Sequence, residues 1–160
     1  MNRKLMAGFK IILIVTFVLA GFWGLGQIND NAGEVSAADE GDLKILKSEV
    51  TSKAKFYPYK AGKTDMEVIA VKAGDGTIRT ALNTCQVCYD SGRGYYTQQG
   101  NELVCNNCGN RFKIDQIEKI KFGCNPIPVM PENKTDDGKY ITVSKAFLTA
   151  NQKYFVDWKR

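Results

Sequence analysis

The sequence predicts a β-rich α+β domain of short antiparallel hairpins, with a double CxxC knuckle and a helix at its C-terminal end. Three observations carry this prediction. From Leu43 onward, short apolar and β-branched runs alternate with Gly, Asp and Asn, which is typical of strands joined by tight turns. Two CxxC pairs each follow a run of this kind. Ser144 precedes a run with helical spacing and can cap it.

The predicted strands follow one another at short intervals. A hairpin of residues 66–72 and 77–83 turns at Asp75-Gly76, because this pair favours a tight turn, and it leads directly into Cys85. A second hairpin, of residues 94–98 and 102–105, turns near Gly100 and leads into the second CxxC pair. The other predicted elements are a strand at 54–59 that Pro58 places at a sheet edge or a strand end, a short helix at 114–120, a proline-rich loop at 124–131, a strand at 140–143 and a helix from 144 to 154.

The first 26 residues have the composition of a membrane anchor or an export signal. Arg3, Lys4 and Lys10 precede residues 11–26, which carry no charge, and positive residues stay on the cytoplasmic side of a membrane. We therefore expect a single-pass protein of the cell membrane. Its domain, residues 43–160, then lies outside the cytoplasm, joined by a flexible tether at 27–42. The alternative is a protein that is secreted after its leader is cleaved.

Charge and composition exclude several classes of function. Three of the 22 basic residues lie in the leader, and the other 19 are mixed with 17 acidic residues along the chain. Such a mixed surface gives no reason to expect a nucleic-acid partner. The chain has no histidine, which excludes a Ser-His-Asp triad, an HExxH zinc site and a histidine general base.

The cysteines are the remaining candidates for a functional site. Two residues between cysteines let both sulfurs turn inward on one tight loop. Two such loops complete a tetrahedron around zinc or iron, as in a zinc-ribbon or rubredoxin-like knuckle. Gly109 after the second pair suits the positive φ of such a knuckle, whereas Tyr89 follows the first pair, so we expect an asymmetric site. The pairs are Cys85/Cys88 and Cys105/Cys108, with sixteen residues between them.

Cys124 stands apart, in a loop bounded by Gly123 and Pro126. It is a candidate fifth ligand, an exchanging ligand or a redox partner, and the alternative is an inert buried cysteine. Met130, six residues later, is a candidate soft ligand for copper. For the four CxxC cysteines, cross-paired disulfides and a purely structural zinc ribbon also remain open.

The segment RTALNTCQVCYDSGRGYYTQQGNELVCNNCGNRF, followed by GCNPIPV, resembles the FtrD-like family of membrane-associated iron-sulfur proteins. The resemblance rests on the two CxxC pairs, the CGNRF segment and the CNP loop, and it covers residues 56–155. It implies an iron or iron-sulfur centre and a link to bacterial iron transport beside an iron permease. The ligands that it implies are Cys85, Cys88, Cys105 and Cys108, with Cys124 added as a candidate metal ligand.

We therefore expect a membrane-anchored, extracytoplasmic metal or iron-sulfur binding protein that supports iron or metal transport or the associated electron transfer. An iron permease or a redox protein is the expected partner, and zinc or, less favoured, copper is the alternative to iron. The sequence shows no catalytic group besides its cysteines. The rival functions are a thiol-disulfide oxidoreductase in which one CxxC cycles, and a zinc ribbon that displays Tyr95, Tyr96 and Phe112 as an interaction surface.

Overall fold

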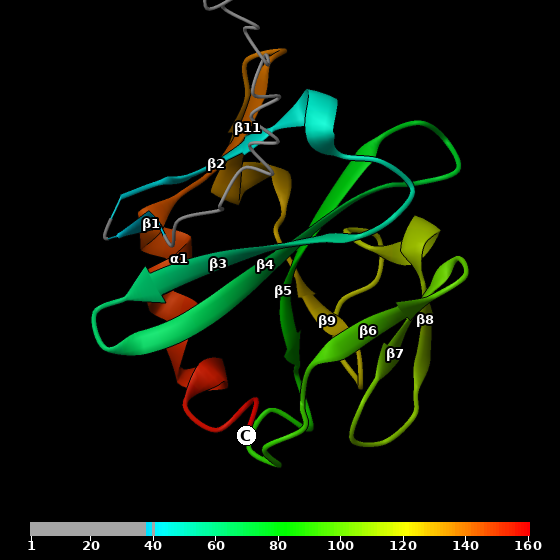
Figure 1. Cartoon of the computed structure of the whole chain (residues 1–160), viewed down its shortest axis with the longest axis vertical. Coiled ribbons are helices and arrows are strands. Elements are labelled where there is room, and N and C mark those ends of the chain that lie inside the picture. Colours follow the sequence, from blue (N-terminus) through cyan, green and yellow to red (C-terminus); the bar gives the residue numbers. More distant parts are fainter. Residues whose placement is uncertain (1–37, 40) are drawn as a thin grey trace, which may run out of the picture. The chain divides into compact units, whose positions relative to one another are not determined.

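The computed structural model describes residues 38–39 and 41–160 (Figure 1). The predicted anchor or signal at 1–26 lies outside the described residues, as does most of the predicted tether at 27–42. Near the end of that tether, Ala38–Asp39 form the strand β1, and the Asp42 carboxylate accepts a hydrogen bond from the backbone N–H of Lys145. No helix in the described part of the chain is long and apolar enough to cross a membrane.

Three small sheets make up the domain, which confirms the predicted β-rich fold. Figure 1 shows the strands β6, β7 and β8 lying on the β5–β9 side of the largest sheet. All strand pairs are antiparallel except β1 with β3. The largest sheet has the order β1-β3-β4-β5-β9, with β3 at Lys55–Ala61, β4 at Thr64–Lys72, β5 at Ile78–Cys85 and β9 at Pro126–Pro128. The second pairs β10 (Lys134–Asp136), β11 (Tyr140–Val143) and β2 (Leu43–Leu46), and the third pairs β6 (Tyr96–Gln99), β7 (Glu102–Cys105) and β8 (Arg111–Lys113).

Local signals account for the main hairpin and for the C-terminal helix. Between β4 and β5, Gly76 has a φ of +81°, and Asp75 accepts hydrogen bonds from the backbone and the hydroxyl of Thr77. The predicted turn is therefore confirmed. The helix α1 runs over Lys145–Asn151 and continues as a 3-10 turn at Gln152–Phe155, and the Ser144 hydroxyl caps it by accepting from the Phe147 N–H.

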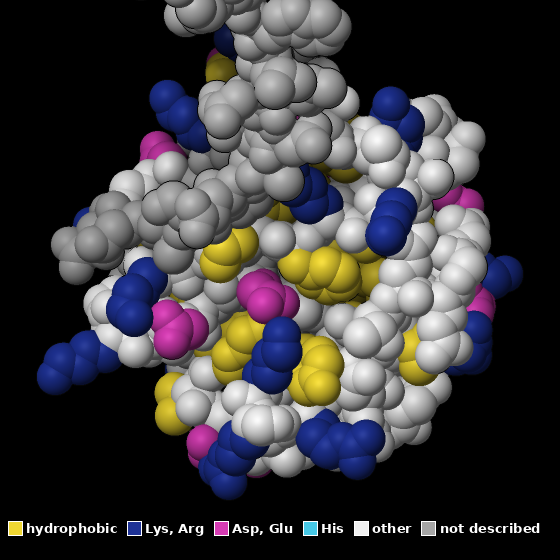
Figure 2. Space-filling model, viewed as in Figure 1, with side chains coloured by type: hydrophobic (Ala, Val, Ile, Leu, Met, Phe, Trp, Pro, Cys, Tyr) yellow, Lys and Arg dark blue, Asp and Glu magenta, His cyan; other side chains and the backbone are white. Residues whose placement is uncertain are grey.

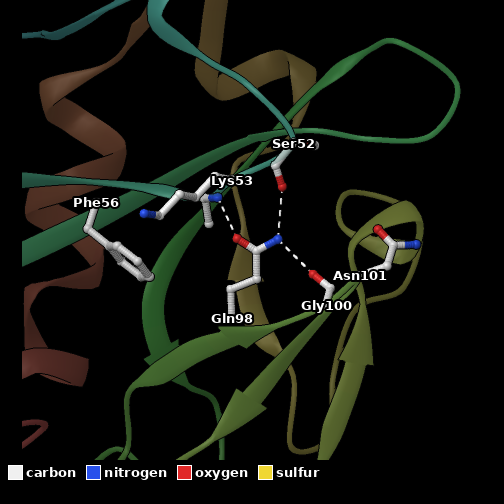
Figure 3. A pocket seen from close by; sticks show the side chains of 7 residues that line it. Ser52, Lys53, Phe56, Gln98, Gly100 and Asn101 are labelled. Atoms are coloured by element: carbon white, nitrogen blue, oxygen red, sulfur yellow. Dashed lines mark hydrogen bonds between the residues drawn. The ribbon is translucent and has the colours of Figure 1, made fainter.

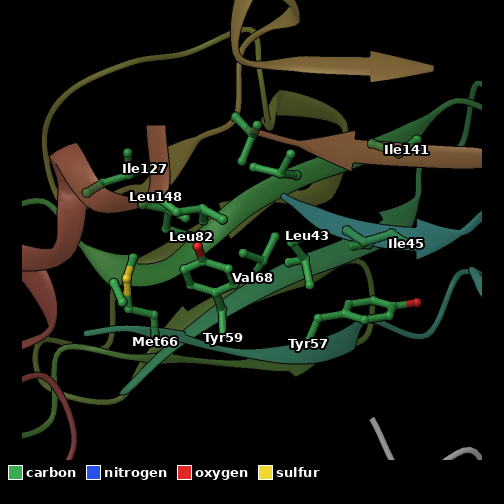
Figure 4. Close-up of a cluster of buried hydrophobic side chains, with 14 of the residues drawn as sticks. Leu43, Ile45, Tyr57, Tyr59, Met66, Val68, Leu82, Ile127, Ile141 and Leu148 are labelled. Atoms are coloured by element: carbon green, nitrogen blue, oxygen red, sulfur yellow. The ribbon is translucent and has the colours of Figure 1, made fainter. Parts of the chain in front are cut away.

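The largest sheet separates two hydrophobic clusters, because side chains alternate between the faces of a strand. Figure 4 shows the first cluster, in which side chains of β3, β4 and β5 point toward those of β2, β11 and α1. It includes Leu43, Ile45, Tyr57, Tyr59, Met66, Val68, Leu82, Ile127, Ile141 and Leu148. The second cluster lies on the opposite face, under the third sheet, and includes Ile69, Val71, Ala81, Tyr96, Leu103, Phe112, Ile114, Ile117 and three cysteines.

This second cluster contains two of the aromatic residues proposed as an interaction surface, and it also contains cysteines of both CxxC pairs. Tyr96 and Phe112 are 1 % and 4 % exposed, so they belong to the core and not to an interaction surface. Cys85, at the end of β5, and Cys105, at the end of β7, are buried in the same cluster. The packing of the third sheet against β5 therefore brings the two CxxC loops together.

Two predicted elements differ from the structure. Residues 114–120 do not form a helix: the chain makes one 3-10 turn at Ile114–Gln116, because Ile114 and Ile117 both pack into the second cluster. Glu118 then takes a φ of +67°, which an α-helix does not allow. The predicted loop at 124–131 contains β9, which pairs with the edge of β5, and its prolines are tolerated because β9 is itself an edge strand.

Charged side chains are spread over the surface of the domain. On the face shown in Figure 2, Lys and Arg side chains are interspersed with Asp and Glu side chains. Several form surface ion pairs, such as Lys47 with Asp136 and Arg111 with Glu102. Exposed pairs of this kind contribute little to stability, because water and dissolved salt screen them.

Candidate metal centre

Three loops meet at the cysteines. The first follows β5, the second joins β7 to β8, and the third precedes β9. The backbone carbonyl of Cys124, in the third loop, accepts hydrogen bonds from the Tyr96 hydroxyl at 2.9 Å and from the Asn110 side-chain amide at 2.6 Å. The Gln86 N–H, in the first loop, donates to the Asn125 carbonyl at 3.2 Å. The third loop is thus tied to both CxxC loops.

The five sulfur atoms form two overlapping groups of three. In each group all three sulfurs lie within 4.8 Å of one another. We call Cys85, Cys88 and Cys105 the inner trio, and Cys88, Cys108 and Cys124 the outer trio. Cys88 belongs to both, and all five cysteines are free thiols in this structure.

Burial separates the two trios. Cys85 and Cys105 are 0 % and 1 % exposed, and Cys88 is 8 % exposed. Cys108 is exposed and Cys124 is half-buried. The inner trio therefore lies within the second hydrophobic cluster, whereas the outer trio opens to solvent.

The second CxxC loop has the geometry of a metal knuckle. The Cys105 sulfur accepts hydrogen bonds from the backbone N–H groups of Cys108 and Asn107, and the Cys108 sulfur accepts from the N–H of Asn110. Gly109 has a φ of +72°, and its N–H donates to the Cys105 carbonyl at 2.9 Å. These N–H dipoles stabilise thiolate charge.

The first CxxC loop also directs backbone N–H groups at a cysteine sulfur, but its turn has a different geometry. The Cys85 sulfur accepts hydrogen bonds from the N–H groups of Val87 and Cys88, but the turn closes later, where the Cys85 N–H donates to the Gly94 carbonyl at 2.7 Å. A Cβ atom on Gly94 would lie 2.3 Å from the Cys88 carbonyl oxygen, so only glycine fits there. The two loops are therefore asymmetric, as the residue after the first pair, Tyr89, predicts.

The thiols differ in how readily they lose a proton. Burial raises the pKa of Cys105 and of Cys124 to about 12 and also raises the pKa of Cys88. For Cys85, burial acts in the same direction, but two backbone N–H groups and the Tyr96 hydroxyl, which shares its one proton between this sulfur and the Cys124 carbonyl, outweigh it and lower the pKa. The Asn110 N–H lowers the pKa of Cys108. Each trio thus contains one cysteine that forms a thiolate readily, and thiolates are the metal-binding form.

The donor set fits a thiophilic metal. Sulfur is the only donor type that the two trios offer, and soft thiolates suit zinc, copper(I) and iron-sulfur centres. The structure brings together all five cysteines that the sequence proposed as ligands. Met130 is carried away from them, because β9 runs antiparallel to β5, from the level of Cys85 toward Thr80.

Other residues of the site gave no signal in the sequence. Tyr96 and Asn110 position Cys124, and Gly94 lets the first loop pass close to Cys88. Each acts on a group that is distant in the sequence or through a contact that only folding creates. All three lie within the segment that carries the family resemblance, but the CxxC pattern itself does not require them.

A pocket of about 640 Å³ lies elsewhere, between the start of β3 and the β6–β7 turn (Figure 3). The Gln98 side chain crosses it. Its oxygen accepts from the Ala54 N–H at 2.6 Å, and its nitrogen donates to the carbonyls of Ser52 and Gly100, each at 2.8 Å. Since the backbone satisfies the polar groups of Gln98, we interpret this pocket as a structural junction between two sheets.

The fold and the cysteine cluster define a class of protein: a small β-rich domain with a thiolate site that can hold a metal. The chain belongs to the FtrD-like family, described as membrane iron-sulfur containing protein FtrD-like, whose model matches residues 50–155. Among solved structures, the quaternary ammonium Rieske monooxygenase CntA in complex with inhibitor MMV12 is similar at a TM-score of 0.44 and 13 % identity. The match covers 66 % of this chain and 31 % of that chain, and it is too weak to bear on function. No curated protein matches the chain.

Proposed function

We propose that this protein holds iron or an iron-sulfur centre outside the cytoplasm, attached to the cell membrane, and that it serves iron transport or the associated electron transfer. The convergence of five cysteine sulfurs from three loops carries this proposal. The family description adds iron-sulfur and membrane. Cys85, Cys88, Cys105 and Cys108 are the proposed ligands, with Cys124 beside them.

The protein's own groups suit a centre that exchanges electrons or metal with a partner. Backbone N–H groups directed at Cys85, Cys105 and Cys108 stabilise the thiolates, and the burial of the first two excludes water from one side. An iron-sulfur centre, when bound, supplies one-electron chemistry whose potential depends on such hydrogen bonds and on solvent exposure. The exposed Cys108 places the other side within reach of a partner.

Two exposed apolar side chains lie in the loops that surround the cysteines. Val87, inside the first CxxC pair, is 57 % exposed, and Phe122, two residues before Cys124, is 76 % exposed. Single exposed apolar side chains are common on protein surfaces, but these two lie in loops that meet at the cysteines. An iron permease or a redox protein is the partner that we propose for this surface.

The metal content of the full chain tests the proposal. The protein is purified in detergent without oxygen, and iron, zinc, copper and acid-labile sulfide are measured together with the visible spectrum and the free-thiol count. We expect iron with charge-transfer absorption, lost in Cys85→Ser. Val87→Ser is the matched control, because it changes the same loop without removing a sulfur, and it should retain both.

Other outcomes would support the rival functions. One colourless zinc ion per chain would indicate a structural zinc ribbon. A metal-free protein with a reducible disulfide would indicate a thiol-disulfide oxidoreductase. Protease added to intact spheroplasts tests the location, since a domain outside the cytoplasm is digested and a domain inside is protected.

A further inference from the structure

The arrangement of the sulfurs differs from that of a single four-thiolate site. A tetrahedral site with metal–sulfur distances of about 2.3 Å requires all six sulfur–sulfur distances to be about 3.8 Å. Among the described residues, the groups whose sulfurs all lie within 4.8 Å of one another are the two trios, and neither contains all four CxxC cysteines. Cys108 also contacts the Cys105 thiol, but the compact trio that contains it is the one with Cys88 and Cys124.

We infer that the outer trio, Cys88, Cys108 and Cys124, is a second metal position for a thiophilic ion, and that the Cys88 thiolate bridges it to the inner position of Cys85, Cys88 and Cys105. This inference rests on the proposed function only in that the cysteines bind metal. It adds that the site has two positions and that Cys124 is a ligand of the outer one alone.

The position of Cys124 is fixed by groups that are not ligands. Its backbone carbonyl is held by the buried Tyr96 hydroxyl and by the Asn110 side chain, and Asn110 follows Cys108 by two residues. The same loop holds Phe122 at a φ of +73°, a strained conformation for an aromatic residue, and the Asn125 side chain donates to the Phe122 carbonyl at 2.5 Å. The fold thus maintains Cys124 beside Cys88 and Cys108 against a local cost.

Exposure distinguishes the two positions. An ion that arrives from solution meets Cys108 and Cys124 first, because the inner trio is at most 8 % exposed. Binding at the outer trio forms three metal–sulfur bonds, displaces the waters or the carrier ligand of the ion, and releases to solvent the protons of those thiols that were protonated. No electron is transferred, so the outer position takes an ion as cargo without a redox partner.

Cadmium-113 NMR tests the two positions directly. Metal-free full chain, in detergent and without oxygen, is titrated with ¹¹³Cd(II), a spectroscopic probe for thiophilic ions. We expect two ions per chain and two resonances, with the Cys88 Hβ protons correlated to both. The Hβ protons of Cys85 and Cys105 should correlate with one resonance only, and those of Cys108 and Cys124 with the other only.

Cys124→Ser should lower the stoichiometry from two ions to one and remove the outer resonance, while the retained inner resonance shows that the variant is folded. Val156→Ser, at a residue that is 71 % exposed and outside the cysteine loops, should still bind two ions. One resonance correlated with all four CxxC cysteines, or two ions retained by Cys124→Ser, would overturn the inference and leave the proposed function intact. No cadmium bound by the unaltered chain would instead overturn both.

Discussion

Gly94 lies against the backbone of Cys88 and Tyr89, so Gly94→Ala should disturb the first CxxC loop directly. The added Cβ would lie 2.3 Å from the Cys88 carbonyl oxygen and 2.7 Å from the Tyr89 Cα, and real Cβ contacts essentially never fall below 3.0 Å. One of these backbone segments must therefore move by about 0.7 Å or more, since neither contact is a flexible side-chain end. Overpacking of this kind costs about 1–3 kcal/mol.

The strain acts on the metal site because Cys88 belongs to both trios. If about 2 kcal/mol of the strain is relieved when Cys88 leaves its ligand position, metal affinity falls about 30-fold, since each 1.4 kcal/mol is a factor of ten. Strain that the metal-free protein cannot relieve in this way lowers its free energy of unfolding instead, so the two effects together should amount to about 2 kcal/mol. Urea denaturation of the metal-free protein and competition with a chromophoric chelator measure the two effects.

Gly41→Ala is the matched control for this experiment. The same Cβ added at Gly41 meets no atom within 4 Å, and neither glycine has a positive φ, so the two variants differ in steric contact and not in backbone strain. The reasoning would be refuted if Gly94→Ala matched Gly41→Ala in both stability and metal affinity.

Three further predictions concern ionisable groups. Lys134→Met leaves the part-buried Glu118 carboxylate, 2.5 Å from the Lys134 ammonium, without its cation. Urea denaturation should show a loss of about 2–3 kcal/mol in the free energy of unfolding, partly recovered when Glu118→Gln is added. A loss below about 1 kcal/mol would contradict this. Tyr96→Phe removes a hydrogen bond to the Cys85 sulfur, so the pKa of Cys85 should rise. The pH dependence of Cys85 alkylation in the metal-free protein should then shift to higher pH. An unchanged pH dependence would count against that hydrogen bond. The hydrogen bonds from Thr77 lower the pKa of Asp75 from 3.8 to about 2, so this carboxylate stabilises the fold above pH 3.8, and its contribution is lost as the pH falls through 2. Asp75→Asn should therefore make the free energy of unfolding less dependent on pH between 3.8 and 2. An unchanged slope in that interval would show that Asp75 is not responsible.

The part-buried ion pair of Glu118 and Lys134 also shows why the predicted helix at 114–120 is absent. Glu118 accepts hydrogen bonds from the backbone and the hydroxyl of Thr80, on the neighbouring strand, as well as from Lys134. These partners lie 38 and 16 residues away in the sequence. A seven-residue apolar pattern does not by itself specify a helix, and here long-range contacts hold the segment in a 3-10 turn followed by a further turn.

The sequence by itself determined the features that depend on neighbouring residues. The Asp75-Gly76 turn, the Ser144 cap and the knuckle after Cys105 each require only a few consecutive residues, because the hydrogen bonds that define them span two to four positions. The spacing of the CxxC pairs likewise predicted that two thiol loops would face each other.

Only the tertiary structure decided how the five thiols are grouped. Cys124 lies sixteen residues after Cys108 and 36 residues after Cys88, and it joins them because β9 pairs with β5 and because Tyr96 and Asn110 hold its carbonyl. The division into a buried inner trio and an open outer trio follows from the packing of the third sheet on β5. Spacing specifies which cysteines share a loop, whereas the distances between loops depend on contacts that form only when the sheets pack.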